Sequence, residues 1–250
     1  SERLTETVFA NMPWLEPLFD AGVEVQLGTA AWGVYRNGPL VGSLPEQVVG
    51  LADHERSWLV GFKRLVLACG ARDLALPFPG WNQPGVMGAT ALQLLLCRYE
   101  AFAGRRVLIA GSHDLALETA LIALDKGLEV AGLVEVRAAP QGDPALVARL
   151  AEAGVHIACN AGIAEARGGI DGVETVLLRD GTEVACDTLV MAVGQVPMVE
   201  LPDAAGAGRT FQPHRGGYVP TSDATISAVG LCAGLADTGF DHVAYRFEWL

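Results

Sequence analysis

The sequence of 250 residues is long enough for one large domain or two small ones, and its 51% hydrophobic and 18% charged residues are typical of a globular α/β protein. Its formal net charge of −12 repels phosphate backbones, so we expect no nucleic-acid partner. No apolar run approaches the roughly 18 residues that a membrane helix needs, and no signal-like segment opens the chain.

Five cysteines are scattered along the chain without a C-x-x-C pair, which favours a cytoplasmic protein with reduced thiols. The same spacing removes the dithiol motif on which disulfide reductases depend. Cys69 and Cys232 lie in apolar segments and are interpreted as core thiols. The five histidines have no metal-ligand spacing, so we expect no metal site.

The N-terminal part combines one amphipathic helix with short β-type runs. Apolar spacing over residues 5–21 predicts the helix, which Pro13 interrupts. Turns rich in Gly, Asn and Asp then separate apolar runs, a pattern typical of a small antiparallel sheet. The predicted strands are 23–27, 30–35, 47–52 and 58–62.

A continuous apolar strand is predicted over residues 64–71 and ends at a glycine, as buried parallel strands do. The following segment, 76–86, contains three prolines and two glycines in the sequence LPFPGWNQPGV. Because proline fixes φ and removes a backbone donor, we place the first domain boundary in this segment.

Beyond this boundary strands alternate with helices, which predicts βαβ units and a doubly wound parallel sheet. A helix over 89–101 comes first. The next strands are predicted at 106–111, 128–136 and 155–159, and the helices between them at 114–126 and 144–153. An antiparallel meander (162–166, 173–179, 182–185) and a final strand (187–194) follow.

One turn lies between a predicted strand and a predicted helix, where dinucleotide-binding domains hold a pyrophosphate; it consists of Gly111, Ser112, His113 and Asp114. Glu135 ends the next strand, where an acidic residue would bind a ribose hydroxyl. His113 stands where a second glycine would let phosphate approach, and Asp114 places a repelling carboxylate at the helix start. Two interpretations stay open, an NAD(P) site or a βαβ unit that binds nothing.

Two apolar strands end in the same way, with ACGA at 68–71 and AVGQ at 192–195, on either side of the βαβ region. This repetition indicates that the chain leaves one domain, builds a second and returns to the first. The candidate cofactor-binding residues at these ends are Gly70, Ala71, Arg72 and Gly194. The arginine would neutralise a cofactor phosphate or form a surface ion pair.

Two stretches carry a resemblance to a known family, LVLACGARDLALPFPGWNQPGVMGATALQLLL at 65–96 and RRVLIAGSHDLALE at 105–118. They resemble the A (alpha) subunits of sarcosine oxidase, opine oxidase, dye-linked proline dehydrogenase and hydrogen cyanide synthase, within the FAD/NAD(P)-binding pyridine nucleotide-disulfide oxidoreductase-like superfamily. The resemblance extends over nearly the whole chain. It implies two Rossmann-like dinucleotide-binding domains, the cofactors FAD and NAD(P), and a partner subunit that carries the substrate site.

The resemblance also implies a domain division. Residues 81–189 would form an NAD(P)-type domain inserted into a split FAD-type domain, 1–80 and 190–250. The family's FAD domain opens with a strand, a G-x-G-x-x-G turn and a helix. No such unit precedes residue 1, so we expect an N-terminally incomplete FAD domain.

The family's closing motif appears here with Gly230 and Gly234 as candidate cofactor-binding residues. Leu235 stands where the resemblance implies an aspartate that holds the flavin ribityl chain. Together with the missing opening unit, this departure argues against FAD binding by this chain alone.

Three functions are therefore open. The first, which we take as our prediction, is a subunit or fragment of a FAD-dependent oxidoreductase of the amine- or amino-acid-oxidising type that supports electron transfer with a partner subunit. The second is a non-catalytic structural or nucleotide-sensing member of the same fold. The third is an NAD(P)-binding module without flavin.

Overall fold

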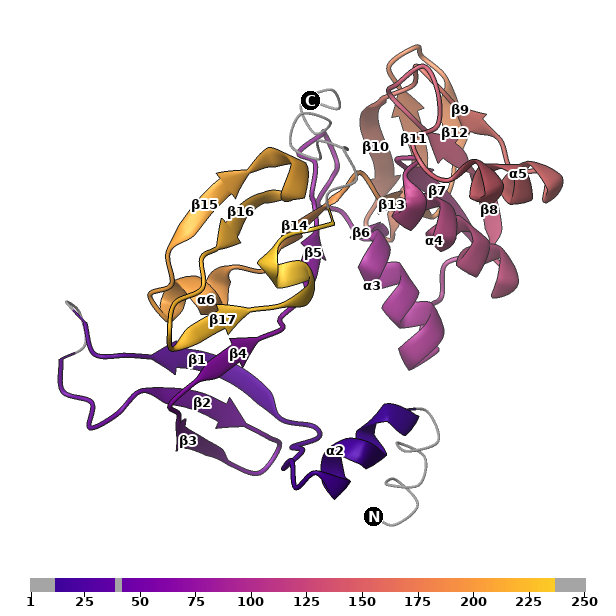
Figure 1. Cartoon of the computed structure of the whole chain (residues 1–250). Helices are drawn as coiled ribbons and strands as arrows, with labels where there is room; N and C mark the ends of the chain where they lie inside the picture. The colour runs from indigo at the N-terminus through magenta and orange to yellow at the C-terminus, as the bar shows by residue number, and fades with distance from the viewer. Residues whose placement is uncertain (1–11, 39–41, 237–250) are drawn as a thin grey trace. The chain divides into compact units, whose positions relative to one another are not determined.

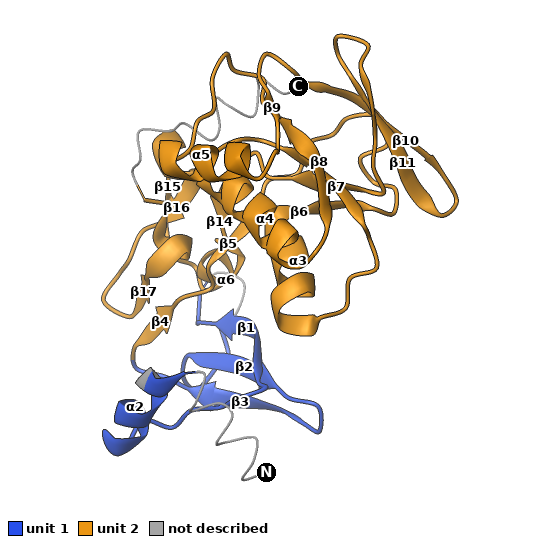
Figure 2. Ribbon diagram, turned by 90° about the vertical axis from the view of Figure 1, so that its right-hand side faces the viewer, with its two compact units in different colours: residues 1–63 blue, residues 64–250 orange. Residues whose placement is uncertain are grey.

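The computed structural model describes residues 12–38 and 42–236. By its internal contacts the chain divides into two units, Ser1–Lys63 and Arg64–Leu250, which Figure 2 colours blue and orange. The predicted division of the chain at residues 80 and 190 is a different one and stays a prediction.

The first unit contains a short helix and a three-stranded antiparallel sheet. The helical turn η1 (Pro13–Leu15) leads into α2 (Glu16–Asp20), inside the predicted helix, whose residues 5–11 lie outside the described ones. The sheet has the order β1-β2-β3 and confirms three predicted strands; they are β1 (Ala30–Tyr35), β2 (Val48–Ala52) and β3 (Ser57–Gly61).

The predicted strand at residues 23–27 is wrong. These residues form no strand and are mostly exposed to solvent. They lie between Gly22 (φ +78°) and Gly28 (φ +68°), whose left-handed backbone turns the chain at both ends. A five-residue segment closed by two such turns is not aligned with a neighbouring strand, so its apolar side chains gain no sheet to pack on.

The second unit is built on a five-stranded parallel sheet of order β6-β13-β7-β8-β9 (Figure 1). The strands are β6 (Val86–Gly88), β7 (Arg106–Ala110), β8 (Glu129–Val134), β9 (Ile157–Ala158) and β13 (Thr188–Met191). The helices are α3 (Ala89–Leu94), continued by the π-helical turn η2 (Leu95–Tyr99), α4 (Asp114–Asp125) and α5 (Pro144–Glu152). This sheet confirms the predicted parallel α/β fold.

Strand β7 shows how the sheet is buried on both faces. Val107 and Ile109 belong to the apolar cluster that includes buried residues of α3, α4 and α5. Leu108 and Ala110 belong to the cluster on the other face, which includes the meander. The meander strands are β10 (Ile163–Gly169), β11 (Gly172–Leu178) and β12 (Glu183–Ala185). All four side chains are almost completely buried, as a continuous apolar run in a central parallel strand predicts.

The rest of the second unit consists of three two-stranded sheets. They are β4 (Leu65–Leu67) with β17 (Ile226–Ala228), β5 (Ala71–Asp73) with β14 (Gln195–Pro197), and β15 (Arg209–Gln212) with β16 (Gly217–Pro220). The short helices between them are α6 (Glu200–Ala204), η3 (Pro213–Arg215) and η4 (Gly230–Ala233). The strand predicted over 64–71 is thus split in two, because β4 and β5 have different partners.

Asp73, the last residue of β5, joins this region to the parallel sheet. Its carboxylate accepts hydrogen bonds from the backbone N of Thr90 (2.7 Å) and from Thr90 Oγ1 (2.6 Å) at the start of α3. The N-cap position of α3 is Gly88, which has no side chain to accept from these groups. Asp73 therefore caps α3 from a distant part of the sequence.

Replacing Asp73 by alanine is expected to lower the free energy of unfolding by about 2 kcal/mol, because two hydrogen bonds to a charged acceptor are lost. This corresponds to a fall in melting temperature of roughly 4–8 °C for a chain of this size. Thermal unfolding measures this shift. Asp125→Ala, at an exposed position near the end of α4, is the matched control, for which we expect little change. Equal melting temperatures for the two variants would contradict the role of Asp73.

Candidate functional site

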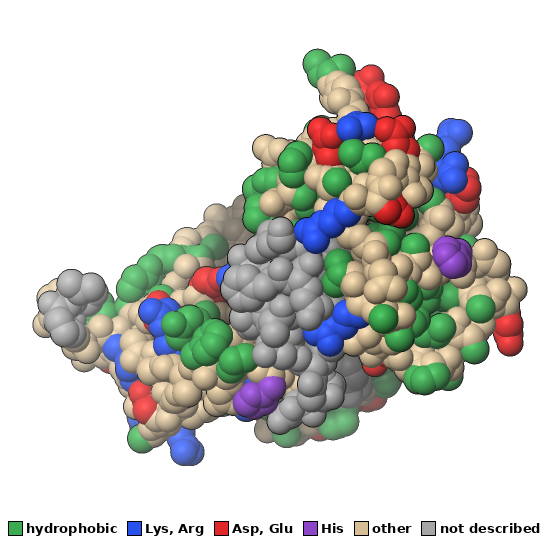
Figure 3. Space-filling model, turned by 90° about the horizontal axis from the view of Figure 1, so that it is seen from above, with side chains coloured by type: hydrophobic (Ala, Val, Ile, Leu, Met, Phe, Trp, Pro, Cys, Tyr) green, Lys and Arg blue, Asp and Glu red, His purple; other side chains and the backbone are tan. Residues whose placement is uncertain are grey.

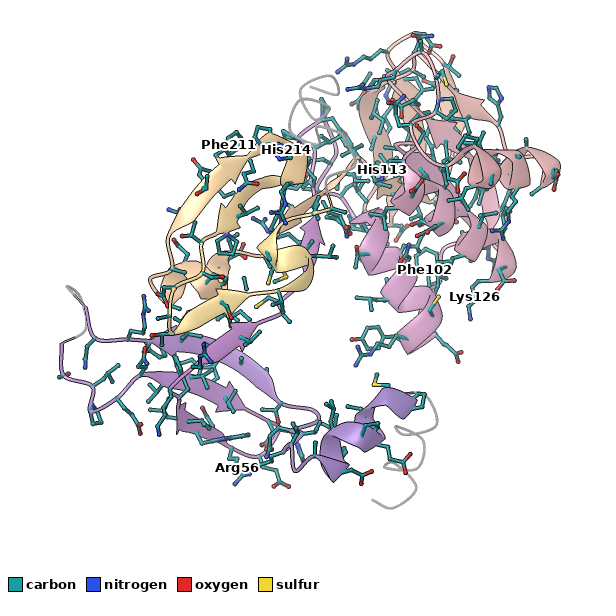
Figure 4. All side chains as sticks on the ribbon, viewed as in Figure 1. Arg56, Phe102, His113, Lys126, Phe211 and His214 are labelled. Atoms are coloured by element: carbon teal, nitrogen blue, oxygen red, sulfur yellow. The ribbon has the colours of Figure 1, made fainter. Side chains whose placement is uncertain are left out.

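The predicted dinucleotide turn lies at the carboxyl end of β7, in the interior of the parallel sheet. Gly111 has φ +113°, and a Cβ at this position would overlap the carbonyl oxygen of Ala192. The turn continues to His113, the N-cap residue of α4, which Figure 4 labels at the start of that helix. The fold therefore places this turn where doubly wound sheets hold a pyrophosphate.

The side chain of Glu135 points into the protein from the end of β8. Glu135 and Ser112 are both 0% exposed. Ser112 Oγ donates a hydrogen bond to Glu135 Oε2, and the backbone N of Arg137 donates to Oε1 at 2.8 Å. Because a buried carboxylate is costly unless it accepts hydrogen bonds, these contacts hold the turn and the end of β8 together.

Residues 137–143, here named the strap, connect β8 to α5 across the start of α4. Three consecutive backbone N–H groups of the strap donate to the turn. The bonds are Gln141 N to Ser112 Oγ (3.1 Å), Gly142 N to Ser112 O (2.9 Å) and Asp143 N to Asp114 Oδ1 (2.7 Å). At its far end the Asp143 carboxylate accepts from the backbone N of Ala145 (2.8 Å) and caps α5. The strap is thus fixed at both ends.

The strap fills the space in which a pyrophosphate would approach α4. A Cβ built on Gly142 would lie 2.8 Å from Asp114 N and 2.7 Å from Asp114 Oδ1, so the strap backbone lies directly against the first turn. The Asp114 carboxylate adds a negative charge at the position where phosphate would need a donor. Glu135 bonds to the turn instead of facing a ribose hydroxyl. The residues present do not fit an NAD(P) pyrophosphate at this turn.

The candidates at the first strand ending lie between β4 and β5. Gly70 has φ +80°, and a Cβ at this position would have no atom within 4 Å. Ala71 and Arg72 begin β5. Arg72 forms an exposed ion pair with Glu200 (3.2 Å), the second of the two roles considered from the sequence. Such a pair is weak, so this guanidinium could exchange it for a phosphate at small cost. A cavity of about 420 Å³ lies beside it, lined in part by Phe211, which Figure 4 labels on β15.

The second strand ending and the closing motif lie in the same unit. Gly194 follows β13 and its carbonyl accepts from the backbone N of Leu74 at 3.0 Å. Gly230 and Gly234 stand at the two ends of η4 with φ values of +67° and +115°. Both glycines therefore have left-handed backbone conformations that side-chain-bearing residues rarely adopt.

Leu235 is 6% exposed and packs inside the second unit. A Cβ on Gly216 would lie 2.9 Å from Leu235 Cδ1, and the Leu235 backbone N donates to Arg215 O at 3.0 Å. A buried leucine offers no acceptor to a hydroxyl. The side chain at this position therefore does not fit a flavin ribityl chain.

The structure brings the turn, Glu135 and the strap together in one network, whereas the other candidates lie around β4, β5, β14 and η4. Sequence reasoning missed the strap and Asp73. The strap left one signal, Asp143-Pro144, because an aspartate followed by proline is typical of a helix start and marks where the loop from β8 ends.

Other classes of site find no support in the described part of the chain. No group of three metal-ligating side chains was found among its residues, and none of its helices has the length and apolar character to cross a membrane. On the face shown in Figure 3, the Lys and Arg side chains that are drawn lie apart from one another, among acidic and neutral residues.

The sequence model of the pyridine nucleotide-disulphide oxidoreductases matches residues 16–245. The chain belongs to this family. The family binds FAD and NAD(P), and the resemblance found from the sequence is confirmed.

Three proteins to which the chain is similar show its relationships within the family. It is 26% identical over 245 residues to a subunit of opine oxidase from Rhizobium meliloti, covering 86% of this chain and 52% of that protein. It is 27% identical over 209 residues to rubredoxin-NAD(+) reductase from Pseudomonas putida, covering 81% and 53%. The crystal structure of L-proline dehydrogenase from P. horikoshii superposes with a TM-score of 0.62 at 24% identity, covering 90% of this chain and 39% of that one, and supports the fold alone. The chain spans about half the length of the curated relatives it matches.

Replacing Glu135 by alanine is expected to release the strap, because the Ser112 hydroxyl and the Arg137 N–H lose this buried acceptor. We expect a loss of about 3 kcal/mol in stability, and at least a tenfold faster hydrogen exchange of the Gln141 and Gly142 amides. Exchange measured by NMR or mass spectrometry tests it. Glu129→Ala, at the start of β8, removes an exposed ion pair with Arg106 of β7; it is the control and should leave the strap protected. Unchanged protection in Glu135→Ala would contradict the network.

Proposed function

We propose that the chain is part of a FAD-dependent oxidoreductase of the amine- or amino-acid-oxidising type and supports electron transfer with a partner subunit that carries the substrate site. The sequence relationship to the opine oxidase polypeptide, which covers 86% of the chain, supports this proposal. In the whole protein, FAD would accept the two electrons released when a C–N bond is oxidised.

The closed dinucleotide turn is the observation that carries the proposal. The relatives include a reductase whose name contains NAD(+) as well as an opine oxidase polypeptide. A reductase of that kind needs an open nicotinamide-nucleotide site, and here the strap and Asp114 cover the start of α4. An amine- or amino-acid-oxidising flavoprotein takes its electrons from the organic substrate and does not need that site.

The proposal includes the domain division expected from the sequence, with 81–189 inserted into 1–80 and 190–250. The pairing of β5 with β14 supports it, because these strands lie just outside the two ends of the inserted segment. In the whole protein, the FAD-type site would be lined by residues of the strand endings and the closing motif, namely Gly70, Ala71, Arg72, Gly194, Gly230 and Gly234, and the flavin ribityl chain would need an acceptor other than Leu235. The five free cysteines support a cytoplasmic location.

The test compares electron donors for the native protein isolated with its bound subunits. Reduction of dichlorophenolindophenol is followed with L-proline, sarcosine or an opine as donor, and separately with NADH or NADPH. We expect a secondary amine or amino acid to reduce the dye and both nicotinamide nucleotides to fail.

Dye reduction by NADH or NADPH alone would overturn the proposal in favour of a reductase. Failure of every donor, with FAD supplied, would also overturn it and would favour the non-catalytic member of the fold. A matched sample with the protein heat-denatured gives the background rate for each donor.

A further inference from the structure

Two cysteines from distant parts of the sequence meet at the ends of one strand pair. β4 and β17 run parallel, with Leu67 opposite Ala228, and the backbone N of Val229 donates to Leu67 O at 2.9 Å. Cys69 follows the end of β4, and η4, which carries Cys232, follows the end of β17. The pairing of the two strands thus brings both cysteines to the same edge.

The two thiols are neighbours at this edge. Cys232 Sγ lies 3.2 Å from Leu67 O and 3.2 Å from Val229 O, which holds it at the end of the strand pair. In addition to burial, the Cys232 thiol lies near enough to Cys69 to raise the pKa of the Cys69 thiol. Disulfide formation needs such a close approach of side chains from backbones that can adjust.

The two thiols differ in their exposure to solvent. Cys232 is 0% exposed, whereas Cys69 is partly exposed, so a reagent in solution reaches Cys69 first. At Gly70, the next residue, a Cβ atom would have no neighbouring atom within 4 Å, so the space beside Cys69 is open. A partly exposed thiol beside a buried one is the arrangement of an attacking and a resolving cysteine.

The backbone beside both cysteines can adjust to a covalent bond. Gly70 follows Cys69 directly, and Gly230 and Gly234 flank the turn that carries Cys232. All three have positive φ, and glycine changes its backbone angles at little steric cost. A shift of one thiol toward the other therefore need not disturb the paired residues of β4 and β17.

We propose that Cys69 and Cys232 form a two-electron thiol–disulfide couple that a low-molecular-weight disulfide such as oxidised glutathione converts to the intramolecular disulfide. The Cys69 thiolate attacks one sulfur of the oxidant, and the departing thiolate takes up the proton that Cys69 gave off. The Cys232 sulfur then attacks the Cys69 sulfur of the mixed disulfide, and the second departing thiolate takes up the proton of Cys232. Two protein thiols are oxidised and one small disulfide is reduced to two thiols.

The couple is slow to react. Burial raises the pKa of the Cys69 thiol, and the neighbouring Cys232 and the charge of Glu200 raise it further, so little thiolate is present at neutral pH. The exposed Cys97 provides an internal comparison for reaction with the same oxidant. The couple requires neither FAD nor a second polypeptide, so it can be tested independently of the proposed function.

The test incubates the full chain with graded ratios of oxidised to reduced glutathione, quenches with acid, alkylates the denatured chain and maps the cysteines by mass spectrometry. We expect a peptide cross-linked between Cys69 and Cys232 whose yield rises with the ratio and reverses on reduction. Glutathione attached stably to Cys69 in the unmodified chain, or both cysteines alkylated while Cys97 carries glutathione, would overturn the proposal.

Single variants identify the roles of the two thiols. Cys232→Ser is expected to trap glutathione on Cys69, and Cys69→Ser is expected to leave Cys232 unmodified because it is buried. Cys97→Ser is the matched control and should keep the cross-link. The measurement on the unmodified chain decides the proposal even where a variant folds poorly.

Discussion

A fully buried carboxylate constrains the turn between β7 and α4 in the second unit. Glu135 has no exposure to water, so its charge has to be balanced by hydrogen bonds from inside the protein. The Ser112 hydroxyl and the Arg137 N–H provide two of them. Because Ser112 turns inward to do so, its hydroxyl and carbonyl oxygens accept from the strap, and the strap lies over the start of α4. One buried charge is thus coupled to the closure of the site.

The fold and the turn before α4 depend on different residues, which explains how the chain keeps the parallel sheet although this turn does not fit a pyrophosphate. The parallel sheet rests on apolar side chains such as those of β7, buried on both faces, and on Gly111, which allows close packing against Ala192. These features do not require a ligand. The polar residues at the turn can change while the sheet stays intact, and His113 and Asp114 are such changes. The family fold is therefore retained although the turn no longer fits a pyrophosphate.

Much of the fold follows from local sequence patterns. The periodicity places α4 and α5 within a residue or two of their observed bounds, and the apolar runs locate β7, β8 and β13. The substituted turn residues also indicated a weakened nucleotide site. The strap was beyond prediction, because its hydrogen bonds use backbone N–H groups that every non-proline residue has. The proximity of Cys69 and Cys232 was hidden for another reason: it depends on the pairing of β4 with β17, two strands far apart in the sequence.

Titration of the full chain with NADH and NADPH by isothermal calorimetry tests the closed turn most directly. The account predicts no saturable heat up to millimolar nucleotide, because the strap and the Asp114 carboxylate exclude the pyrophosphate. Saturable binding in the micromolar range, together with slower hydrogen exchange of the amides at 112–114, would show that the strap gives way to the nucleotide and would contradict it.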